Sequence, residues 1–388
     1  MTIAEATSQL PSTRQAAREA AERVLAGLSP SAESGLAFLF ASPHHAEAIE
    51  EAVEEVQSCL RPRHLLGCTA ESVIGGGAEH ERRPALSVWA GVLPSTALAS
   101  GHVTLENARD GQAFLGAPEI PRGPASLLLI ANPFTFPADD YLARLAEDFP
   151  DLQVLGGMAS GARAPGETKL IHGGEVHSSG AVAAVVSGRV RVRPIVSQGC
   201  RPFGKRHVVT KTEDNFIVQL GGRPTLERLS AELEQLSEEE RGMLQRGLHV
   251  GLAIDARKQE HRRGDFLVRN VVGFRREDGA ALVTDVVKPG VTIQFHLRDA
   301  ETASEDLDAL LRDAREAGAA PLGGLLFSCN GRGSRLFDSP SHDASAVQRE
   351  LGAFPISGFF AAGEIGPIGG RNFLHGFTAS LALFEDEG

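Results

Sequence analysis

The sequence has few cysteines and no long apolar run, and each shortage excludes a class of protein. The four cysteines are far apart and form no C-x-x-C pair, so they predict neither a structural zinc site nor a disulfide framework. No stretch of about 18 apolar residues is present, as a membrane-spanning helix would require. The first twenty residues also lack the apolar core of a signal peptide. We therefore expect a reduced, cytoplasmic protein without a membrane partner.

Basic residues are outnumbered, and the formal net charge is -12. Nucleic-acid binding requires a basic face, so this balance argues against a nucleic-acid partner. The sequence contains no phosphate-binding G-x-x-x-x-G-K-[ST] motif, and the glycine run 75–77 is not a dinucleotide fingerprint. The pairs His44–His45 and His342–Asp343 do not have the spacing of metal ligands on a helix. We expect no metal and no cofactor.

The overall composition is that of an ordinary globular protein, with 42% hydrophobic and 23% charged residues. A chain of 388 residues exceeds one ordinary hydrophobic core, so two domains are expected. We predict an N-terminal helical extension over 1–34, with its helix at 13–27, and two domains over 35–215 and 216–388. The run 188–222 reads as extended strands that join the two domains.

Three segments share one pattern: strand, small polar turn, helix, strand, glycine-rich turn, strand. They occupy 36–93, 126–192 and 324–384, and a weaker fourth copy is expected at 249–274. The glycine-rich turns align at Gly67, Gly156 and Gly358. Strand–helix–strand units favour parallel pairing, and a closing strand adds an antiparallel edge. We predict a mixed α/β fold of two parts, with β-sheets flanked by helices; the alternative is that any α/β protein gives this spacing without a true repeat.

Helix signals also mark the segment between the second and third copies. A helical stretch is expected over 225–245, where Ser237 and Glu240 have the spacing of a capping box. A strand followed by a long helix is expected over 291–318.

The run 323–384 is the strongest candidate for a functional site. It contains many glycines, which let backbone approach a ligand closely. Apolar runs within it stop at small or polar residues, namely Ser328, Cys329, Asn330, Arg332, Glu364, Arg371, Asn372 and His375. A segment built only for packing would not need so many hydrogen-bonding groups.

Several motifs resemble the FIST family, named for F-box and intracellular signal transduction proteins. They are LGCTAESVIGGG, LGGMASG, QGCRPFGKRHVVTK, GDFLVRNVVG, FHLRDAETASEDL, LFSCNGRGSRLF, GFFAAGEIGP and GRNFLHGFT. The resemblance implies a FIST N-terminal and a FIST C-terminal domain, and a sensory module that binds small ligands such as amino acids. Members are often fused to signalling outputs, whereas this sequence has no recognisable output domain. It would be a stand-alone sensor, or would have another activity.

If the repeated turns converge at the strand ends, they line a cleft. The side chains expected near it are Cys68, Thr69, Glu71, Asn132, Ser160, Cys329, Asn330, Arg332 and Glu364. For an amino-acid ligand, Arg332 could fork onto the carboxylate and Glu364 could meet the ammonium group. Asn330 can both donate and accept. The alternative is that Arg332 and Glu364 pair with each other and brace the turns.

Two further side chains enter the predicted binding set. Arg371 belongs to the polar C-terminal run, and Asn270 interrupts an apolar strand. Strand alternation puts Arg269 and Asn270 on opposite faces, so only one of them should point into a cleft.

An enzyme is a second hypothesis. Cys329 at a strand end could act as nucleophile with His375 as base, and Asn330 or Asn372 could orient the imidazole. The alternative is that Cys329 packs as a small apolar residue and that His375 is a core histidine. A third hypothesis is a protein-interaction scaffold. The leading hypothesis is a sensor for an amino acid or a similar small metabolite, acting with a downstream signalling protein.

Overall fold

The computed structural model describes residues 1–29, 35–108, 111–255, 258 and 264–387. The chain forms two compact units. Unit 1 combines Met1–Val196, Leu307–Leu374 and Thr378–Gly388, and unit 2 combines Ser197–Asp306 with His375–Phe377. Both units are therefore discontinuous in sequence, whereas the predicted domains are consecutive segments. Within the described residues, no helix is both long and apolar enough to cross a membrane.

Unit 1 contains the three predicted copies, which we call repeats I, II and III. Each repeat has a first strand, a helix, a parallel second strand, and a closing strand antiparallel to the first. In repeat I these elements are β2 Leu36–Ala41, α2 Ile49–Leu60, β3 His64–Thr69 and β6 Leu86–Val92. In repeat II they are β9 Ala125–Ala131, α3 Ala138–Asp148, β10 Gln153–Met158 and β13 Ala181–Gly188. In repeat III they are β22 Gly323–Cys329, α7 His342–Leu351, β23 Ile356–Ala361 and β26 Thr378–Asp386. The mixed α/β fold is thus confirmed.

One glycine recurs at the same place in each second strand. Gly67, Gly156 and Gly358 lie opposite a leucine of the first strand. A Cβ atom at these glycines would lie 1.9, 1.8 and 1.9 Å from that leucine's carbonyl oxygen. Gly156 and Gly358 also have φ values of 151° and 157°, which side chains rarely adopt. A side chain would therefore clash with the neighbouring strand at all three positions, which explains why each of the aligned residues is glycine.

A hairpin follows each second strand and completes the sheet of a different repeat. These hairpins are β4 Ser72–Gly75 with β5 Ala78–Glu81, β11 Leu170–His172 with β12 Glu175–His177, and β24 Glu364–Ile368 with β25 Arg371–His375. β4 from repeat I pairs with β23, β11 from repeat II pairs with β3, and β24 from repeat III pairs with β10. Each sheet thus contains strands from two repeats, in a cyclic exchange.

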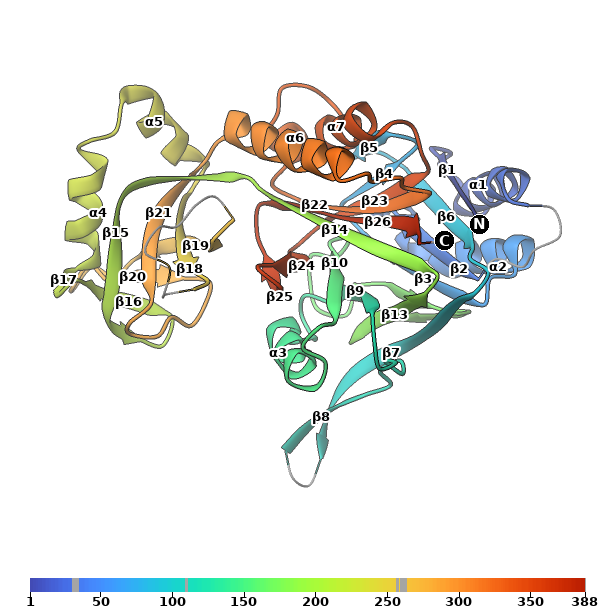
Figure 1. Ribbon diagram of the computed structural model, residues 1–388, viewed down its shortest axis with the longest axis horizontal. Coiled ribbons are helices and arrows are strands. Elements are labelled where there is room, and N and C mark those ends of the chain that lie inside the picture. Colours follow the sequence, from blue (N-terminus) through green and yellow to red (C-terminus); the bar gives the residue numbers. More distant parts are fainter. Residues whose placement is uncertain (30–34, 109–110, 256–257, 259–263, 388) are drawn as a thin grey trace. The chain divides into compact units, whose positions relative to one another are not determined.

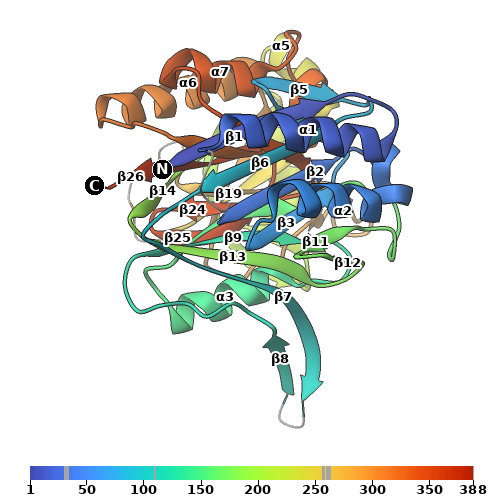
Figure 2. The same cartoon turned by 90° about the vertical axis from the view of Figure 1, so that its right-hand side faces the viewer.

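The remaining strands extend these sheets at their edges. β1 Thr2–Ser8 pairs with β6, so part of the segment expected to be a helical extension is a strand; helix α1 Thr13–Gly27 follows as predicted. β14 Val190–Gln198 lies next to β26 in the sheet of repeat III. β7 Thr96–Ala108 and β8 Gly111–Leu115 extend the sheet of repeat II as a long hairpin, which projects at the bottom of Figures 1 and 2.

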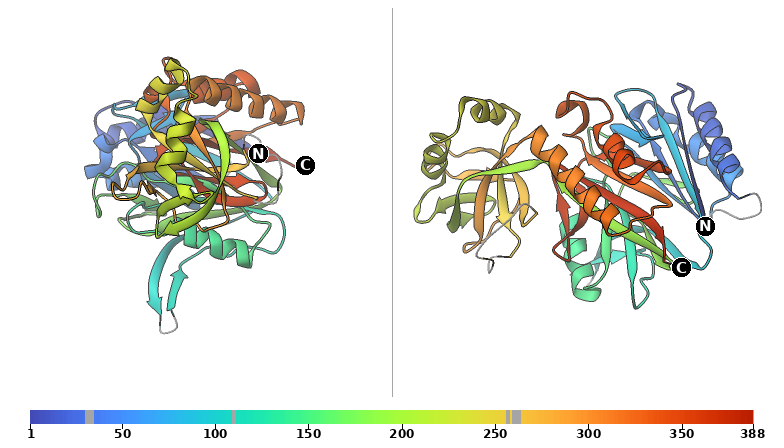
Figure 3. Two further views of the ribbon diagram at one scale, coloured as in Figure 1. Left: turned by 90° about the vertical axis from the view of Figure 1, so that its left-hand side faces the viewer. Right: turned by 45° about the horizontal axis from the view of Figure 1, so that its top comes forward.

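The three sheets share a central core, and helices cover their outer faces. The central core includes Phe38, Trp89, Leu128 and Phe359, which come from all three repeats. Helices α1 and α2 pack on the sheet of repeat I, and α3 packs on that of repeat II. Helix α6 (Ala300–Glu316) and α7 cover the sheet of repeat III, where Figure 3 shows them side by side.

Unit 2 is built on an antiparallel sheet. Its strands are β15 Cys200–Glu213, β16 Phe216–Leu220, β17 Arg223–Pro224, β18 Leu248–Ala253, β19 Phe266–Phe274, β20 Ala281–Val283 and β21 Thr292–Arg298. β15 pairs with both β21 and β16, so the sheet closes on itself around an apolar core. Its helices are α4 Thr225–Leu233 and α5 Glu238–Met243, and the predicted capping box of Ser237 and Glu240 is present.

The fourth copy expected at 249–274 is wrong. β18 and β19 are adjacent antiparallel partners, with His249 opposite Asn270, rather than parallel strands joined by a crossover. The alternating apolar pattern of a strand is the same in parallel and antiparallel pairing, so the sequence does not distinguish the two.

Candidate functional site

The turns that follow β3, β10 and β23 converge, as the repeat predicts. The amide of Met158 donates to the carbonyl of Gly363 (2.8 Å), and the amide of Gly161 donates to that of Thr69 (3.1 Å). Ser160 links the other two turns, because its hydroxyl accepts from the amide of Glu71 (2.9 Å) and donates to the carbonyl of Phe360. The turn after β10 is therefore hydrogen-bonded to both of the others and connects them.

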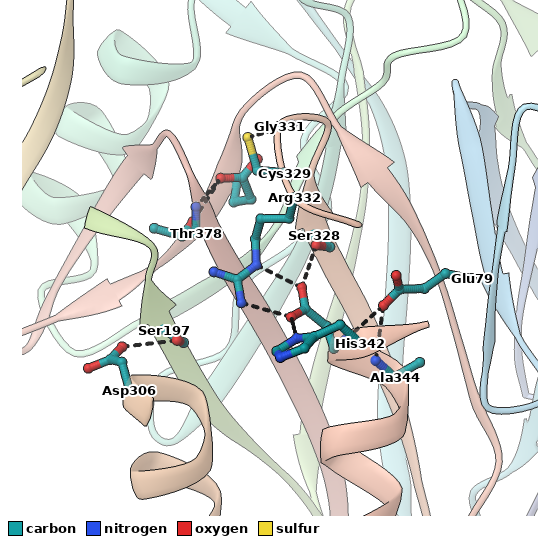
Figure 4. Close-up of polar contacts among 12 residues, drawn as sticks. Glu79, Ser197, Asp306, Ser328, Cys329, Gly331, Arg332, His342, Ala344 and Thr378 are labelled. Atoms are coloured by element: carbon teal, nitrogen blue, oxygen red, sulfur yellow. Dashed lines mark hydrogen bonds and ion pairs between the residues drawn. The ribbon is translucent and has the colours of Figure 1, made fainter. Parts of the chain in front are cut away.

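Beside these turns, the end of β22 carries a buried group of polar side chains. We call Cys329, Asn330, Arg332, Asp343 and Glu364 the polar centre. Cys329 ends β22, Asn330 and Arg332 lie in the turn after it, Asp343 is in the first turn of α7, and Glu364 begins β24. All five belong to repeat III, and Figure 4 shows Arg332 extending toward the first turn of α7.

Arg332 is fully buried and is held by Asp343 at two points. Its Nε lies 2.7 Å from Oδ2 and its Nη2 lies 2.7 Å from Oδ1 (Figure 4). Ser328 also donates to Asp343 (2.8 Å). Burial opposes ionisation of Asp343, but the guanidinium of Arg332 holds the pKa of that carboxyl well below its usual range. The alternative expected from sequence, a pair of Arg332 with Glu364, is replaced by this one.

Glu364 is the second buried carboxyl of the polar centre. Its Oε2 accepts from the amide (3.0 Å) and the hydroxyl (2.8 Å) of Thr378. Burial nevertheless raises the pKa of Glu364 to about 8, although the hydrogen bonds from Thr378 and the Cys329 thiol lower it. At neutral pH this carboxyl is therefore largely protonated, and Oε2 already accepts two hydrogen bonds.

Three polar atoms of the polar centre are buried and have no hydrogen-bond partner among the described residues. They are Oδ1 of Asn330, Nη1 of Arg332 and Oε1 of Glu364. Burying such an atom unpaired costs about 1–3 kcal/mol. Together they offer an acceptor, a charged donor and a carboxyl oxygen, which is a set that a small polar molecule could satisfy.

A carboxyl group from repeat I, that of Glu79, contacts the start of α7 next to the polar centre. Glu79 in β5 is buried, and its Oε1 accepts from the amides of Asp343 (2.9 Å) and Ala344 (3.1 Å) (Figure 4). Glu79 thus caps α7 from another repeat. Burial and then the charge of Asp343 raise the pKa of Glu79 well above its usual range. Sequence reasoning missed Glu79, because nothing local indicates that its hairpin joins repeat III.

Phe337 covers the arginine. The guanidinium carbon of Arg332 lies 5.2 Å from the centre of its ring, and the ring of His342 stacks on Phe337 at 3.5 Å. His342 also contacts Asp343 (3.0 Å), so it belongs to the surroundings of the ion pair. His342 and Asp343 are the first two residues of α7.

The predicted nucleophile is buried at the edge of the polar centre. The amide of Gly331 donates to Sγ of Cys329 (3.4 Å). The predicted base, His375, is assigned to unit 2, whereas Cys329 belongs to unit 1. The Cys329–His375 pair stays a prediction.

Other predicted binding residues have different surroundings. Glu71 pairs with Arg335 (2.5 Å), which also donates to the carbonyl of Asn330, so Glu71 lies beside the turn after β22. Cys68 is buried in β3, and burial raises the pKa of its thiol well above the usual value. Asn132 closes its own turn, because its side chain accepts from the amide of Phe134 and donates to the carbonyl of Ser178.

Arg371 and Asn270 are both exposed. The guanidinium of Arg371 lies over the ring of Phe373, at 5.2 Å from its centre. Asn270 belongs to unit 2, where its neighbour Arg269 is buried and pairs with Asp285 (2.7 Å). The expected alternation along this strand is therefore present, with Arg269 on the buried side.

A cavity of about 670 Å³ lies elsewhere in unit 1. Its walls are the segments 120–126, 148–153 and 190–192, together with Val186, Gly188 and Glu387. These segments adjoin the starts of β9 and β10, at the end of the sheet opposite the glycine-rich turns. In the part of the chain that the structure describes, no group of three or more His, Cys, Asp or Glu could hold a metal ion.

Comparisons with known proteins identify both halves of the chain. Residues 35–223 match the FIST N domain and residues 226–367 match the FIST C domain. An uncharacterized protein of Mycobacterium tuberculosis is 40% identical over 397 residues, which covers 100% of both chains. An uncharacterized protein of Mycobacterium bovis is 40% identical over 393 residues, again with 100% coverage of both. The similarity is thus spread over the full length of the chain.

Proposed function

This chain belongs to the FIST family, and from that premise we propose that it is a sensor of an amino acid or a similar small metabolite. FIST domains are associated with small-ligand sensing and signalling. The ligand would bind at the polar centre, and the bound state would be read by a downstream signalling protein in the cytoplasm. The observation that carries the proposal is the presence of three buried, unpartnered polar atoms around the turn after β22.

The geometry changes how an amino acid would be recognised. Asp343 already occupies Nε and Nη2 of Arg332, so only Nη1 remains for a ligand carboxylate. The forked contact expected from the sequence is therefore replaced by a single charged hydrogen bond. Asn330 Oδ1 and Glu364 Oε1 remain for an ammonium group. Because Glu364 is largely protonated when the site is empty, binding of an ammonium group would release a proton from it.

The test is a thermal-shift screen of the twenty amino acids, followed by calorimetric titration of any that stabilise the protein. A ligand at 100 times its dissociation constant should stabilise the native state by about 2.7 kcal/mol. Glu364→Gln should weaken that ligand at least tenfold, and Glu147→Gln on the exposed surface of α3 serves as the matched control. Absence of any shift at millimolar concentration, or equal binding by Glu364→Gln, would refute the proposal.

The two other hypotheses remain predictions with tests of their own. Enzymatic turnover that persists in Cys329→Ala would eliminate that cysteine as the nucleophile. A scaffold would bind a protein partner whose affinity depends on surface residues and is insensitive to Glu364→Gln.

A further inference from the structure

Three polar side chains from three strands of unit 1 meet away from the polar centre. The hydroxyl of Ser100 in β7 lies 2.8 Å from Nδ1 of His64, at the start of β3. The same hydroxyl lies 3.0 Å from Nε2 of His172, at the end of β11. Ser100 is thus placed between two imidazoles, and each is within hydrogen-bond distance.

The hydroxyl has only one proton, so one of the two imidazole nitrogens that face it must carry a proton of its own. Ser100 can donate to one imidazole nitrogen, so the other imidazole must donate its N–H to Oγ. One imidazole is therefore able to accept the serine proton, and the other is able to stabilise negative charge on the oxygen. A serine beside a single histidine would not have this complementary pair.

The strands hold the group rigidly while leaving it accessible. Ser100 is paired with Ala184 of β13, and His172 is paired with Leu66 of β3. Side chains on paired strands are positioned more accurately than those on loops. Ser100, His64 and His172 are all partly exposed, so the group lies toward the surface rather than deep in the core.

The surrounding residues lower the pKa of both imidazoles, so both are neutral at neutral pH. The charged groups near the two rings differ. Burial and then Arg63 lower the pKa of His64. Burial lowers the pKa of His172, as do the nearby His177, His102 and His64, whereas Glu175 raises it. A neutral imidazole is the form that accepts a proton. Glu175 lies opposite His172 in the β11–β12 hairpin, where its carboxylate can offset a positive charge on His172, whereas Arg63 adjoins His64 in sequence. We therefore assign the added proton to His172.

We propose that Ser100 is a reactive nucleophile for small activated esters, with His172 as its general base and the N–H of His64 as a hydrogen-bond donor to Oγ. The site is independent of the small-ligand proposal, because it uses none of the residues of the polar centre.

The chemistry balances without any further reagent than water. Oγ of Ser100 forms a bond to the ester carbonyl carbon while its proton passes to Nε2 of His172. The bond from that carbon to the alcohol oxygen then breaks, and the alcohol leaves with the proton from His172. Water next attacks the acyl-serine and gives a proton to His172. Oγ leaves, recovers that proton, and the carboxylic acid is released.

Covalent labelling tests the nucleophile directly. We would treat the full chain with diisopropyl fluorophosphate at pH 7.5, in which Oγ displaces fluoride from phosphorus. Mass spectrometry of the intact protein and of its peptides should find one adduct, on Ser100. Ser100→Ala should abolish it, and Ser58→Ala, an exposed serine on α2, should label like the wild type. A correctly folded wild type that stays unlabelled, or that is labelled elsewhere, would overturn the proposal.

Turnover of p-nitrophenyl acetate tests the base. Removal of a general base typically lowers a rate by about 10²–10⁴-fold, so His172→Gln should reduce the release of p-nitrophenol by about that factor. The wild-type rate should fall as the pH drops and His172 becomes protonated, and His172→Gln should lose this pH dependence. A rate unchanged in Ser100→Ala, or a pH profile unchanged in His172→Gln, would contradict the assigned roles.

Discussion

Arg332 and Asp343 form a two-point ion pair in which both side chains are fully buried, with two N–O distances of 2.7 Å. The pair joins the turn after β22 to the first turn of α7. The charges compensate each other, and the pair is further hydrogen-bonded by Ser328. It therefore sets the position of Nη1 of Arg332, which has no hydrogen-bond partner in the part of the chain that the structure describes.

Breaking this pair should destabilise the protein strongly. Asp343→Asn keeps the shape of the side chain but leaves Arg332 as a buried charge without a counterion, which typically costs about 3–5 kcal/mol. Urea unfolding followed by circular dichroism measures the difference. Asp308→Asn is the matched control, because its pair with Arg349 is partly exposed and should contribute less than about 1 kcal/mol. Similar losses for both variants would contradict the importance given to burial.

The contribution of Glu364 to stability should fall as the pH rises from about 4.5 to 8. The pKa of Glu364 is raised to about 8 in the folded protein, so the native state binds more protons than the unfolded state in this window. The free energy of unfolding then decreases with pH, by up to about 1.4 kcal/mol per pH unit for this one group. Denaturant titrations at pH 5, 6, 7 and 8 measure the slope.

Glu364→Gln should remove this part of the slope, since glutamine does not titrate. Glu147→Gln should leave it intact. Glu79 contributes in the same direction, so Glu364→Gln is expected to flatten the profile only in part. The same slope in the wild type and in Glu364→Gln would show that burial does not keep Glu364 protonated.

Glu79→Ala should loosen the start of α7. The amides of Asp343 and Ala344 lose their acceptor, and loss of a helix cap costs about 0.5–2 kcal/mol. Hydrogen exchange at these two amides should accelerate before exchange elsewhere in α7. Glu79→Gln keeps an acceptor oxygen and should retain protection. Equal protection in the alanine variant would mean that Glu79 does not cap the helix.

Gly358→Ala should be among the most harmful single substitutions in unit 1. The new Cβ would lie 1.9 Å from the carbonyl oxygen of Leu326, at a φ of 157°. Such backbone strain alone costs about 1–3 kcal/mol, and the steric clash adds to it. Gly174→Ala offers a control, because nothing lies within 4 Å of its added Cβ. Melting temperatures of both variants provide the measurement, and a Gly358→Ala protein as stable as Gly174→Ala would refute the clash.

The repeat could be predicted because its signals are local. Apolar runs of strand length, a helix of matching length and a glycine at one fixed place recur within each copy, and Gly67, Gly156 and Gly358 turn out to face a neighbouring carbonyl oxygen. The destination of the following hairpins could not be predicted. A short buried strand such as β4 has the same pattern whether it pairs within its own repeat or with β23.

The ion-pair partner of Arg332 could not be predicted from the sequence either. The sequence indicates that a buried arginine needs a carboxylate, and it offers Glu364 in the same polar run. The choice of Asp343 depends on where α7 begins, and helix ends are the least certain feature of a sequence-based prediction. Ser100 and His172 are 72 positions apart, and only the exchange of β11 into the sheet of repeat I brings them together.

The cyclic exchange of hairpins has a consequence for synthesis on the ribosome. The strand that completes the sheet of repeat II is β24, in which Ile365 lies opposite Gly156. Repeat I likewise requires β11 from repeat II to complete its sheet. The hairpin of repeat I requires β23 from repeat III as its pairing partner. The sheet of repeat I can be completed once β12 has emerged, whereas the sheets of repeats II and III need strands from the C-terminal part of the chain. Unit 1 as a whole should therefore complete its native structure only after nearly the whole polypeptide has been translated.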